Sequence, residues 1–278
     1  MSLFTRHPGS VVRSWAMVAW VSASATSLQV QALTFTSGVH EVPAGTYGEI
    51  EVSGTAVVSF GSGVEASNLG IYSEQASVHM RGGVVLSMVQ NYGTLLVSGG
   101  RLSSGLMGWD QSEATITGGE HGGNLTARGQ SVLRVSGGRF GMSGADTVAS
   151  NQAVFHWSGG TPSQYIDLVG QATMNVYGSA LTLGGQALAP GDVVTRTSSV
   201  FGPFSSAYTR AAMSVTLADG SSHLGNVIAS TGANPVVAQW TGSLHFLAAP
   251  VPEPATWVML LAGAGLLVVT ARRRQAAA

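Results

Sequence analysis

The sequence predicts an all-β protein: a single-stranded, right-handed parallel β-helix with a C-terminal β cap and one C-terminal transmembrane helix. Glycines recur at intervals of 17, 19, 19, 22 and 19 residues through the middle of the chain. Before each of these glycines, apolar residues alternate with polar ones, as in a strand with one buried face. No stretch between residues 34 and 250 shows the apolar periodicity of an amphipathic helix.

The first segment, residues 1–32, is predicted to be a secretory signal peptide. Two arginines precede a modest apolar stretch at residues 15–21, and small residues follow before Ala32. The apolar stretch is short and is followed by serines, so it is a poor permanent membrane span. We expect cleavage after Ala32, with Ala25 as the alternative, which leaves Leu33 as the mature start.

Residues 33–188 carry the repeat. The markers are six glycines, of which the first five are doubled: Gly82, Gly99, Gly118, Gly137, Gly159 and Gly178. The residues four positions before each marker are apolar: Val78, Leu95, Ala114, Leu133, Phe155 and Met174. The residues two positions before are apolar as well: Met80, Val97, Ile116, Val135, Trp157 and Val176. Rungs of about 19 residues would stack these side chains in one core.

A second, weaker apolar column lies about 12 residues before the next marker. Its expected members are Leu69, Leu86, Leu106, Leu125 and Ile166. Each period therefore holds at least two short strands, and the glycines allow positive φ or tight corners between them. The alternative fold is an antiparallel β-sandwich built from hairpins, because periodicity does not distinguish parallel from antiparallel pairing.

Residues 189–247 lose the glycine spacing and are predicted to cap the exposed end of the solenoid. The expected strands are Met213–Leu217, Leu224–Ile228, a segment around Val236–Trp240, and Leu244–Leu247. The turn at residues 217–221, Leu-Ala-Asp-Gly-Ser, resembles those that close β-helical, autotransporter-like passengers of exported bacterial proteins. Residues 248–256 form a linker rich in proline and alanine.

The C-terminal tail combines a rigid motif, an apolar helix and a basic end. Pro252 and Pro254 fix φ and remove two amide donors, so this segment stays extended and available to another protein. The apolar residues 257–271 would span about 22 Å as a helix, against about 30 Å for a bilayer core. An interfacial Trp257 and snorkelling arginines shorten that difference. The positive-inside rule places residues 272–278 in the cytoplasm.

This tail resembles the PEP-CTERM sorting signal of Gram-negative bacteria. The matching positions are Val251, Pro252, Glu253, Pro254, the helix from Trp257, and Arg272, Arg273 and Arg274. The resemblance implies Sec export, recognition by exosortase (a membrane transpeptidase-like enzyme), a transient membrane anchor, and a final place at the cell surface or in the exopolysaccharide matrix of a biofilm. The alternative is an ordinary C-terminal anchor behind a proline-rich linker.

Composition excludes several classes of function. The chain contains no cysteine, so disulfides and thiolate metal sites are impossible. Outside the two terminal segments, seven arginines face 12 acidic residues, and the chain has no lysine. Nucleic acid is therefore not expected as a partner, because phosphate binding needs a basic face. With 38 glycines and 45% hydrophobic residues, the chain is neither a helical globule nor ordinarily disordered.

Candidate ligand-binding groups are sparse, and neither a metal nor a cofactor is expected. The six histidines beyond residue 32 are scattered, without paired ligand spacing. His79 and His156 occupy equivalent outward positions, but four rungs at about 4.8 Å put them roughly 19 Å apart. Arg101, Glu120 and Arg139 should stack on successive rungs. We expect them to form a charge ladder that fixes the register, in preference to a carbohydrate-contacting stripe.

Asp146 and Asp167 are the one enzymatic hint. They lie 21 residues apart, about one rung, and glycoside hydrolysis uses two carboxylates on one face. Two unrelated aspartates in turns explain the pattern more simply. We therefore expect an exported, non-enzymatic protein of the surface or matrix, with exopolysaccharide as its partner. A β-helical polysaccharide lyase or hydrolase is the alternative.

Overall fold

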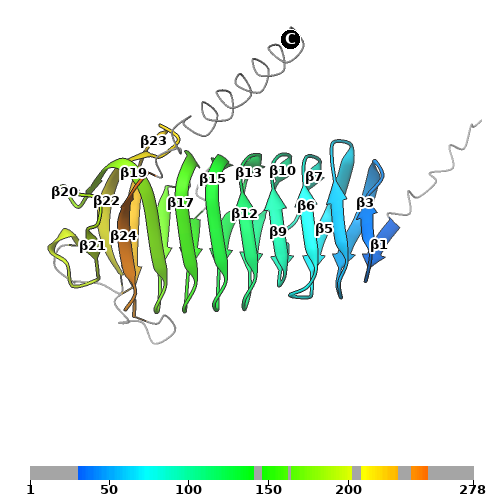
Figure 1. Ribbon diagram of the computed structural model, residues 1–278, viewed down its shortest axis with the longest axis horizontal. Helices are drawn as coiled ribbons and strands as arrows, with labels where there is room; N and C mark the ends of the chain where they lie inside the picture. The colour runs from blue at the N-terminus through cyan, green and yellow to red at the C-terminus, as the bar shows by residue number, and fades with distance from the viewer. Residues whose placement is uncertain (1–30, 141–145, 162–163, 202–207, 231–238, 250–278) are drawn as a thin grey trace, which may run out of the picture.

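The protein forms an all-β solenoid of about seven turns, in which strands stack side by side from β1 at one end to the β19–β24 region at the other (Figure 1). The computed structural model describes residues 31–140, 146–161, 164–201, 208–230 and 239–249. In these ranges the helical content is one 3₁₀ turn, η1 (Ser199–Phe201).

Each turn of the solenoid contributes to as many as three strand faces. The first face consists of β2 (Val39–Glu41), β4 (Val57–Phe60), β6 (Ser77–Met80), β9 (Thr94–Val97), β12 (Glu113–Ile116), β15 (Val132–Phe140), β17 (Val154–Thr161), β19 (Thr173–Leu183) and β24 (Ser243–Ala248). The second consists of β7 (Val84–Val85), β10 (Arg101–Leu102) and β13 (Glu120–His121), with the starts of β3 (Gly45–Val52) and β5 (Val64–Ile71) and the end of β15. The third consists of β1 (Gln31–Phe35), the ends of β3 and β5, β8 (Val89–Asn91), β11 (Gly105–Gly108), β14 (Asn124–Ala127), β16 (Asp146–Ala149), β18 (Tyr165–Leu168) and β23 (Ser222–Ser230).

Pairing between successive turns is parallel. Ala114 pairs with Leu95 of the preceding turn and with Leu133 of the following one, and both ladders run parallel. The same pairing connects β4 to β6 on the first face and β11 to β14 on the third. Consecutive parallel pairing of this kind rules out the antiparallel sandwich.

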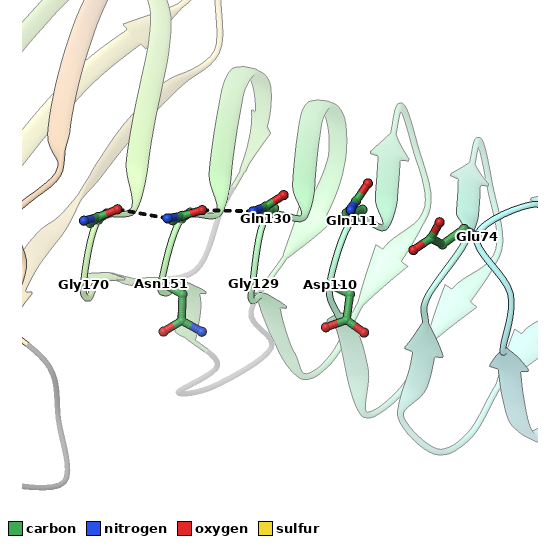
Figure 2. Close-up of a pocket in the computed structure, with 9 residues that line it drawn as sticks. Glu74, Asp110, Gln111, Gly129, Gln130, Asn151 and Gly170 are labelled. Carbon is green, nitrogen blue, oxygen red and sulfur yellow. Dashed lines mark hydrogen bonds between the residues drawn. The ribbon is translucent and has the colours of Figure 1, made fainter.

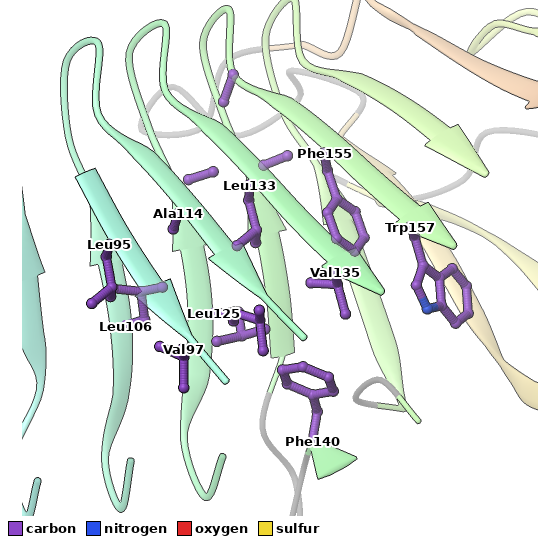
Figure 3. Close-up of a cluster of buried hydrophobic side chains, with 14 of the residues drawn as sticks. Leu95, Val97, Leu106, Ala114, Leu125, Leu133, Val135, Phe140, Phe155 and Trp157 are labelled. Carbon is purple, nitrogen blue, oxygen red and sulfur yellow. The ribbon is translucent and has the colours of Figure 1, made fainter. Parts of the chain in front are cut away.

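The two main apolar columns predicted from the sequence form the core of the first face. Their twelve residues, Val78 to Met174 and Met80 to Val176, pair in the expected order from β6 to β19. All of them are buried, and Figure 3 shows Leu95, Ala114, Leu133 and Phe155 following one another along the stack. Successive rungs thus place equivalent apolar side chains in contact with one another, so each turn depends mainly on its neighbouring turns for stability.

The weaker column was predicted with one wrong member. Leu86 lies in the corner between β7 and β8 and is 45% exposed. Val89 takes its place in the register, paired with Leu69 on one side and Leu106 on the other. The column was predicted from the distance to the next glycine marker. Because this turn is shorter than the others, that distance leads to Leu86 in the corner instead of Val89 in the strand. Thr147, fully buried, fills the same column between Leu125 and Ile166.

Doubled glycines mark one corner of the solenoid, for two different reasons. A Cβ on Gly118 would lie 2.5 Å from the carbonyl oxygen of Ser98 in the preceding turn. Gly119 has a φ of 88°, which L side chains rarely adopt. The first glycine therefore allows close approach of two backbones, and the second allows the corner itself. The same positive φ recurs at Gly83, Gly100, Gly138 and Gly160.

The interval of 17 residues has a local cause at Asn91. Its buried side chain accepts a hydrogen bond from the amide of Gly93 at 3.1 Å and donates one to the carbonyl of Glu113 at 3.0 Å. These bonds close a tight connection from β8 to β9, which holds only Tyr92 and Gly93. The corresponding connection from β5 to β6 holds residues 72–76. The corner of the solenoid therefore extends less far outward at Tyr92–Gly93 than at residues 72–76.

A buried histidine lies in the core of the second face. His121 is 1% exposed and occupies an otherwise apolar column between Leu102 and Phe140. Its ring stacks on that of Phe140, with centroids 4.6 Å apart. Nε2 donates to the carbonyl of Gly118 at 3.2 Å, while Nδ1 is buried without a partner in the described ranges. Burial lowers the pKa of His121 to about 4, although the Gly118 carbonyl acts in the opposite direction.

Acidification is expected to destabilise the solenoid through His121. The unfolded chain takes up a proton near pH 6.5, and the folded chain only near pH 4. Stability is therefore lost as the pH falls through this window, by roughly 3 kcal/mol in total. Urea unfolding at several pH values should show this loss in the wild type relative to His121→Phe. Equal pH dependence in the two proteins would contradict the assignment.

The C-terminal strands rejoin the stack. The hairpin β22 (Tyr208–Leu217) and β23 pairs antiparallel, but β23 also pairs parallel with β18, and β24 pairs parallel with β19. Strands β20 (Gln186–Leu188) and β21 (Val193–Val194) complete this end. Part of the region expected to be a cap thus continues the parallel stacking. Strands were correctly predicted at Met213–Leu217, Leu224–Ile228 and Leu244–Leu247.

Two side chains fasten this end to the preceding turns. The carboxylate of Asp219, in the turn between β22 and β23, accepts a hydrogen bond from the amide of Gly160 at 2.9 Å. Trp240, which lies outside any strand, is fully buried and donates to the carbonyl of Ala172 at 2.8 Å. The rest of the strand expected around Val236–Trp240, up to residue 238, lies outside the described residues.

Candidate functional sites and the sorting motif

The predicted sorting tail lies outside the described residues. This applies to Val251, Pro252, Glu253, Pro254, Trp257, Arg272, Arg273 and Arg274, and to the helix expected at residues 257–271. Within the described ranges, no helix has the length and apolar character needed to cross a membrane. Ala32, the predicted cleavage point, belongs to β1 and pairs with Glu49, and cleavage there stays a prediction.

The charged ladder forms as expected in its register. Glu120 pairs with Arg101 on one side and with Arg139 on the other, and all three side chains are exposed. No ion pair joins them in the described part of the chain, where Arg81 pairs with Glu41 at 2.6 Å and Arg134 with Glu113 at 3.1 Å. Exposed charges of this kind contribute little to stability.

Histidines do not assemble into a metal site. His79 and His156 lie in one outward column, separated by three intervening turns. His79 contacts the hydroxyl of Ser98, and Nδ1 of His156 lies 3.0 Å from the hydroxyl of Tyr177. Among the described residues, no group of three His, Asp or Glu side chains could hold a metal ion.

Asp146 and Asp167 do come together, on the third face. Asp146 pairs with Tyr165 and Val148 pairs with Asp167, so the two aspartates are one turn and two residues apart. With strands about 4.8 Å apart and a rise of about 3.3 Å per residue, the Cα atoms of such neighbours lie roughly 8 Å apart. They line a pocket of about 390 Å³ with four other residues: Tyr165, Tyr208, Arg210 and Ile228. The Arg210 guanidinium lies 5.3 Å from the centre of the Tyr165 ring.

Burial raises the pKa of both carboxyl groups. Burial, followed by the charge of Asp146, raises the pKa of Asp167 to about 6, and Arg210 opposes this shift. One carboxylate oxygen of Asp167 is buried without a hydrogen-bond partner among the described residues. Burial also raises the pKa of Asp146. A carboxyl group with a raised pKa beside a second carboxylate is a feature of sites that carry out general acid–base catalysis.

A polar groove, which was not predicted, runs along the corner between the third and first faces. It has a volume of about 680 Å³ and is lined by nine residues: Glu74, Asp110, Gln111, Gly129, Gln130, Asn151, Gln152, Gly170 and Gln171. In Figure 2, the glutamine side chains follow one another in a row, and Asp110 and Asn151 point to the opposite side. We call this feature the glutamine groove.

Repeated turns build the groove. In the turns at residues 109–112 and 150–153, the amide of the fourth residue donates to the carbonyl of the first, at 2.9 and 3.2 Å. The second residue has positive φ: 54° at Asp110, 72° at Gly129, 63° at Asn151 and 65° at Gly170. Asp, Asn and Gly are the residues that tolerate this conformation. A glutamine follows each of them, and this recurring pair is the sequence signal of the groove once the turns are stacked.

The glutamine amides form a ladder across successive turns. Nε2 of Gln130 donates to Oε1 of Gln152 at 3.1 Å, and Nε2 of Gln152 donates to Oε1 of Gln171 at 3.2 Å (Figure 2). All three side chains are exposed. The amides are therefore fixed in direction by one another while remaining accessible from solvent.

An aromatic stripe runs along the same corner. The rings of Tyr72, Tyr92 and Trp109 follow one another with centroids 6.2 and 6.1 Å apart. The Arg128 guanidinium continues the stripe, 5.1 Å from the Trp109 ring. Trp109 and Arg128 directly precede the groove residues Asp110 and Gly129. Within the stripe, the rings of Tyr92 and Trp109 are stacked, and those of Tyr72 and Tyr92 are tilted.

Comparison with known proteins identifies the tail and leaves the solenoid without a match. Residues 250–274 match the PEP-CTERM protein-sorting motif. No curated protein and no solved structure matches the chain. The motif implies export, a transient membrane anchor and processing by an exosortase-type membrane enzyme. The chain therefore carries a PEP-CTERM protein-sorting motif behind a β-solenoid.

Proposed function

We propose that this protein is a non-enzymatic component of the cell surface or extracellular matrix, held there by association with exopolysaccharide. The observation that carries the proposal is the sorting motif at residues 250–274, which follows an elongated solenoid. A solenoid of stacked turns offers long, repetitive polar surfaces on which many weak contacts add up. The excess of acidic residues over arginines argues against a nucleic-acid partner.

Processing at both ends belongs to the same proposal. Sec export would remove residues 1–32 after Ala32, and a helix at residues 257–271 would hold the protein in the membrane until exosortase acts on Pro252-Glu253-Pro254. Arg272, Arg273 and Arg274 would stay in the cytoplasm. We further propose that the solenoid is right-handed and that its rungs average about 19 residues, as the glycine intervals indicate.

Retention on the native matrix tests the association with exopolysaccharide. Protein isolated from the producing cells should be retained on purified exopolysaccharide of the same cells, and deletion of the gene should reduce matrix cohesion. Absence of retention together with unchanged cohesion would contradict the proposal.

A second candidate function is that of a β-helical polysaccharide lyase or hydrolase. It is favoured by one observation, the shared pocket of Asp146 and Asp167. Two carboxylates on adjacent turns of one face are the kind of pair that glycoside hydrolysis uses. Reducing-end and unsaturated-uronide assays over a panel of glycans test it, with Asp146→Asn and Asp167→Asn as controls. Product formed by the wild type and lost in both variants would establish the enzyme and overturn the non-enzymatic proposal.

A further inference from the structure

We infer that the glutamine groove is the glycan-binding site of this protein and that it takes a neutral, extended polysaccharide chain laid along the solenoid axis. The inference deepens the proposed function, on which it rests, by naming the residues and the class of polysaccharide. It depends on four properties of the groove: free hydrogen-bonding capacity, repeat spacing, charge and shape.

The ladder leaves half of the capacity of its central amide unused. A glutamine amide has two N–H donors and two lone pairs on oxygen. Gln152 donates one hydrogen to Gln171 and accepts one from Gln130. One donor and one lone pair remain for a ligand, and a sugar hydroxyl can use both because it both donates and accepts. Since the ladder already fixes the side chain, little conformational entropy is lost on binding.

The spacing of the amides suits a polymer. Equivalent residues on adjacent turns lie about 4.8 Å apart, close to the length of one sugar ring in an extended chain. A ligand with this repeat can meet an equivalent amide at each of the consecutive turns that carry Gln111, Gln130, Gln152 and Gln171. Each contact is weak alone, and their number along one chain provides the affinity.

The charge of the groove selects against acidic polymers. The charged side chains among its lining residues are Glu74 and Asp110, and both are acidic. The nearest arginine in sequence, Arg128, directs its guanidinium over the Trp109 ring. A uronate chain would therefore be repelled, whereas a neutral chain presents hydroxyls that the amides and both carboxylates can bind.

A register-fixing role explains the ladder but not the shape of the groove. The hydrogen bonds connect Gln130, Gln152 and Gln171, yet the concave surface extends beyond them to Glu74. Between Glu74 and Asp110, the shortened connection at Tyr92–Gly93 contributes nothing to the lining. The open stretch at this point continues the groove over a connection that holds no glutamine. A chain of several sugars fits this continuity, and a single small ligand would not need it.

The test compares binding of the full-length chain with that of two variants. The native exopolysaccharide is separated into neutral and acidic fractions, and retention on each is measured beside a linear β-glucan and alginate as defined probes. The groove variant is Gln130→Ala/Gln152→Ala. The matched control is Gln90→Ala, because Gln90 is an exposed glutamine on the third face and is not one of the residues that line the groove. Circular dichroism melting of each variant verifies folding.

We expect the groove variant to lose neutral-glycan binding by about ten-fold or more, because it removes two amide contacts. The Gln90→Ala variant should bind like the wild type. Equal binding by the folded groove variant, or binding confined to the acidic fraction and alginate, would overturn the inference and leave the proposed function intact. Failure of the wild type to bind any fraction would overturn both. If the double alanine variant unfolds, the single variants Gln130→Ala and Gln152→Ala replace it, each with an expected loss of a few-fold.

Discussion

Replacing Trp157 with alanine is expected to lower the free energy of unfolding by about 3–5 kcal/mol. The side chain is fully buried between Val135 and Val176 in the core column of the first face. Its ring stacks on Phe155 and meets His223 edge-on, with the ring centres of Trp157 and His223 5.5 Å apart. Truncation leaves a cavity next to the Phe155 and His223 rings and removes the hydrogen bond from Nε1 to the carbonyl of Gly159.

Urea unfolding followed by far-UV circular dichroism measures this loss. Leu224→Ala is the control, because Leu224 is a large apolar residue that is 77% exposed and should change stability by less than about 0.5 kcal/mol. In a solenoid, the damage should concentrate in the turns next to Trp157. Hydrogen exchange should therefore accelerate in β15 and β19 before it does in β4. A Trp157→Ala protein as stable as the control would contradict the stacked core.

Changing Pro252, Glu253 and Pro254 together to alanine is expected to abolish processing. The prolines keep the motif extended and remove two amide donors, and alanines restore both freedom and donors. If the processing enzyme recognises the motif in this extended conformation, the alanine variant no longer holds the conformation and also lacks the carboxylate of Glu253. The variant should accumulate in the membrane in a form that has lost the signal peptide but keeps the whole C-terminal tail. Immunoblots of cell fractions would measure this accumulation.

Pro190→Ala provides the matched control for this experiment. Pro190 is an exposed proline in a turn outside the sorting motif, so its loss should leave processing unchanged. Normal maturation and release of the triple variant would show that the motif is not the recognition element, even though residues 250–274 match it.

The fold was predictable because glycine and apolar spacing encode the stacked turns directly. Gly118-Gly119 and the column through Ala114 show this, since each position has one physical requirement that one residue type satisfies. Leu86 was misplaced because an irregular turn changes the count of residues without changing the composition. The parallel direction of pairing could not be derived either, because a strand with one buried face shows the same alternation in both directions.

The candidate sites also differ in how far the sequence predicts them. The sorting motif is contiguous, so its order along the chain suffices to identify it. The pocket of Asp146 and Asp167 was only half anticipated, because Arg210 and Tyr208 reach it from a hairpin that follows in the sequence. The glutamine groove was missed because its residues lie in turns, where polar side chains are the rule. Its recurring positive-φ residue followed by glutamine becomes informative only once the turns are stacked.

The intact mass of the native protein, measured separately in the inner membrane, the cell envelope and the extracellular matrix, tests export and sorting most directly. We predict a protein in the envelope or matrix that lacks residues 1–32 and the segment after about Glu253. A protein found in the inner membrane with Arg272, Arg273 and Arg274 still attached, and with no processed form elsewhere, would contradict export and sorting through the tail.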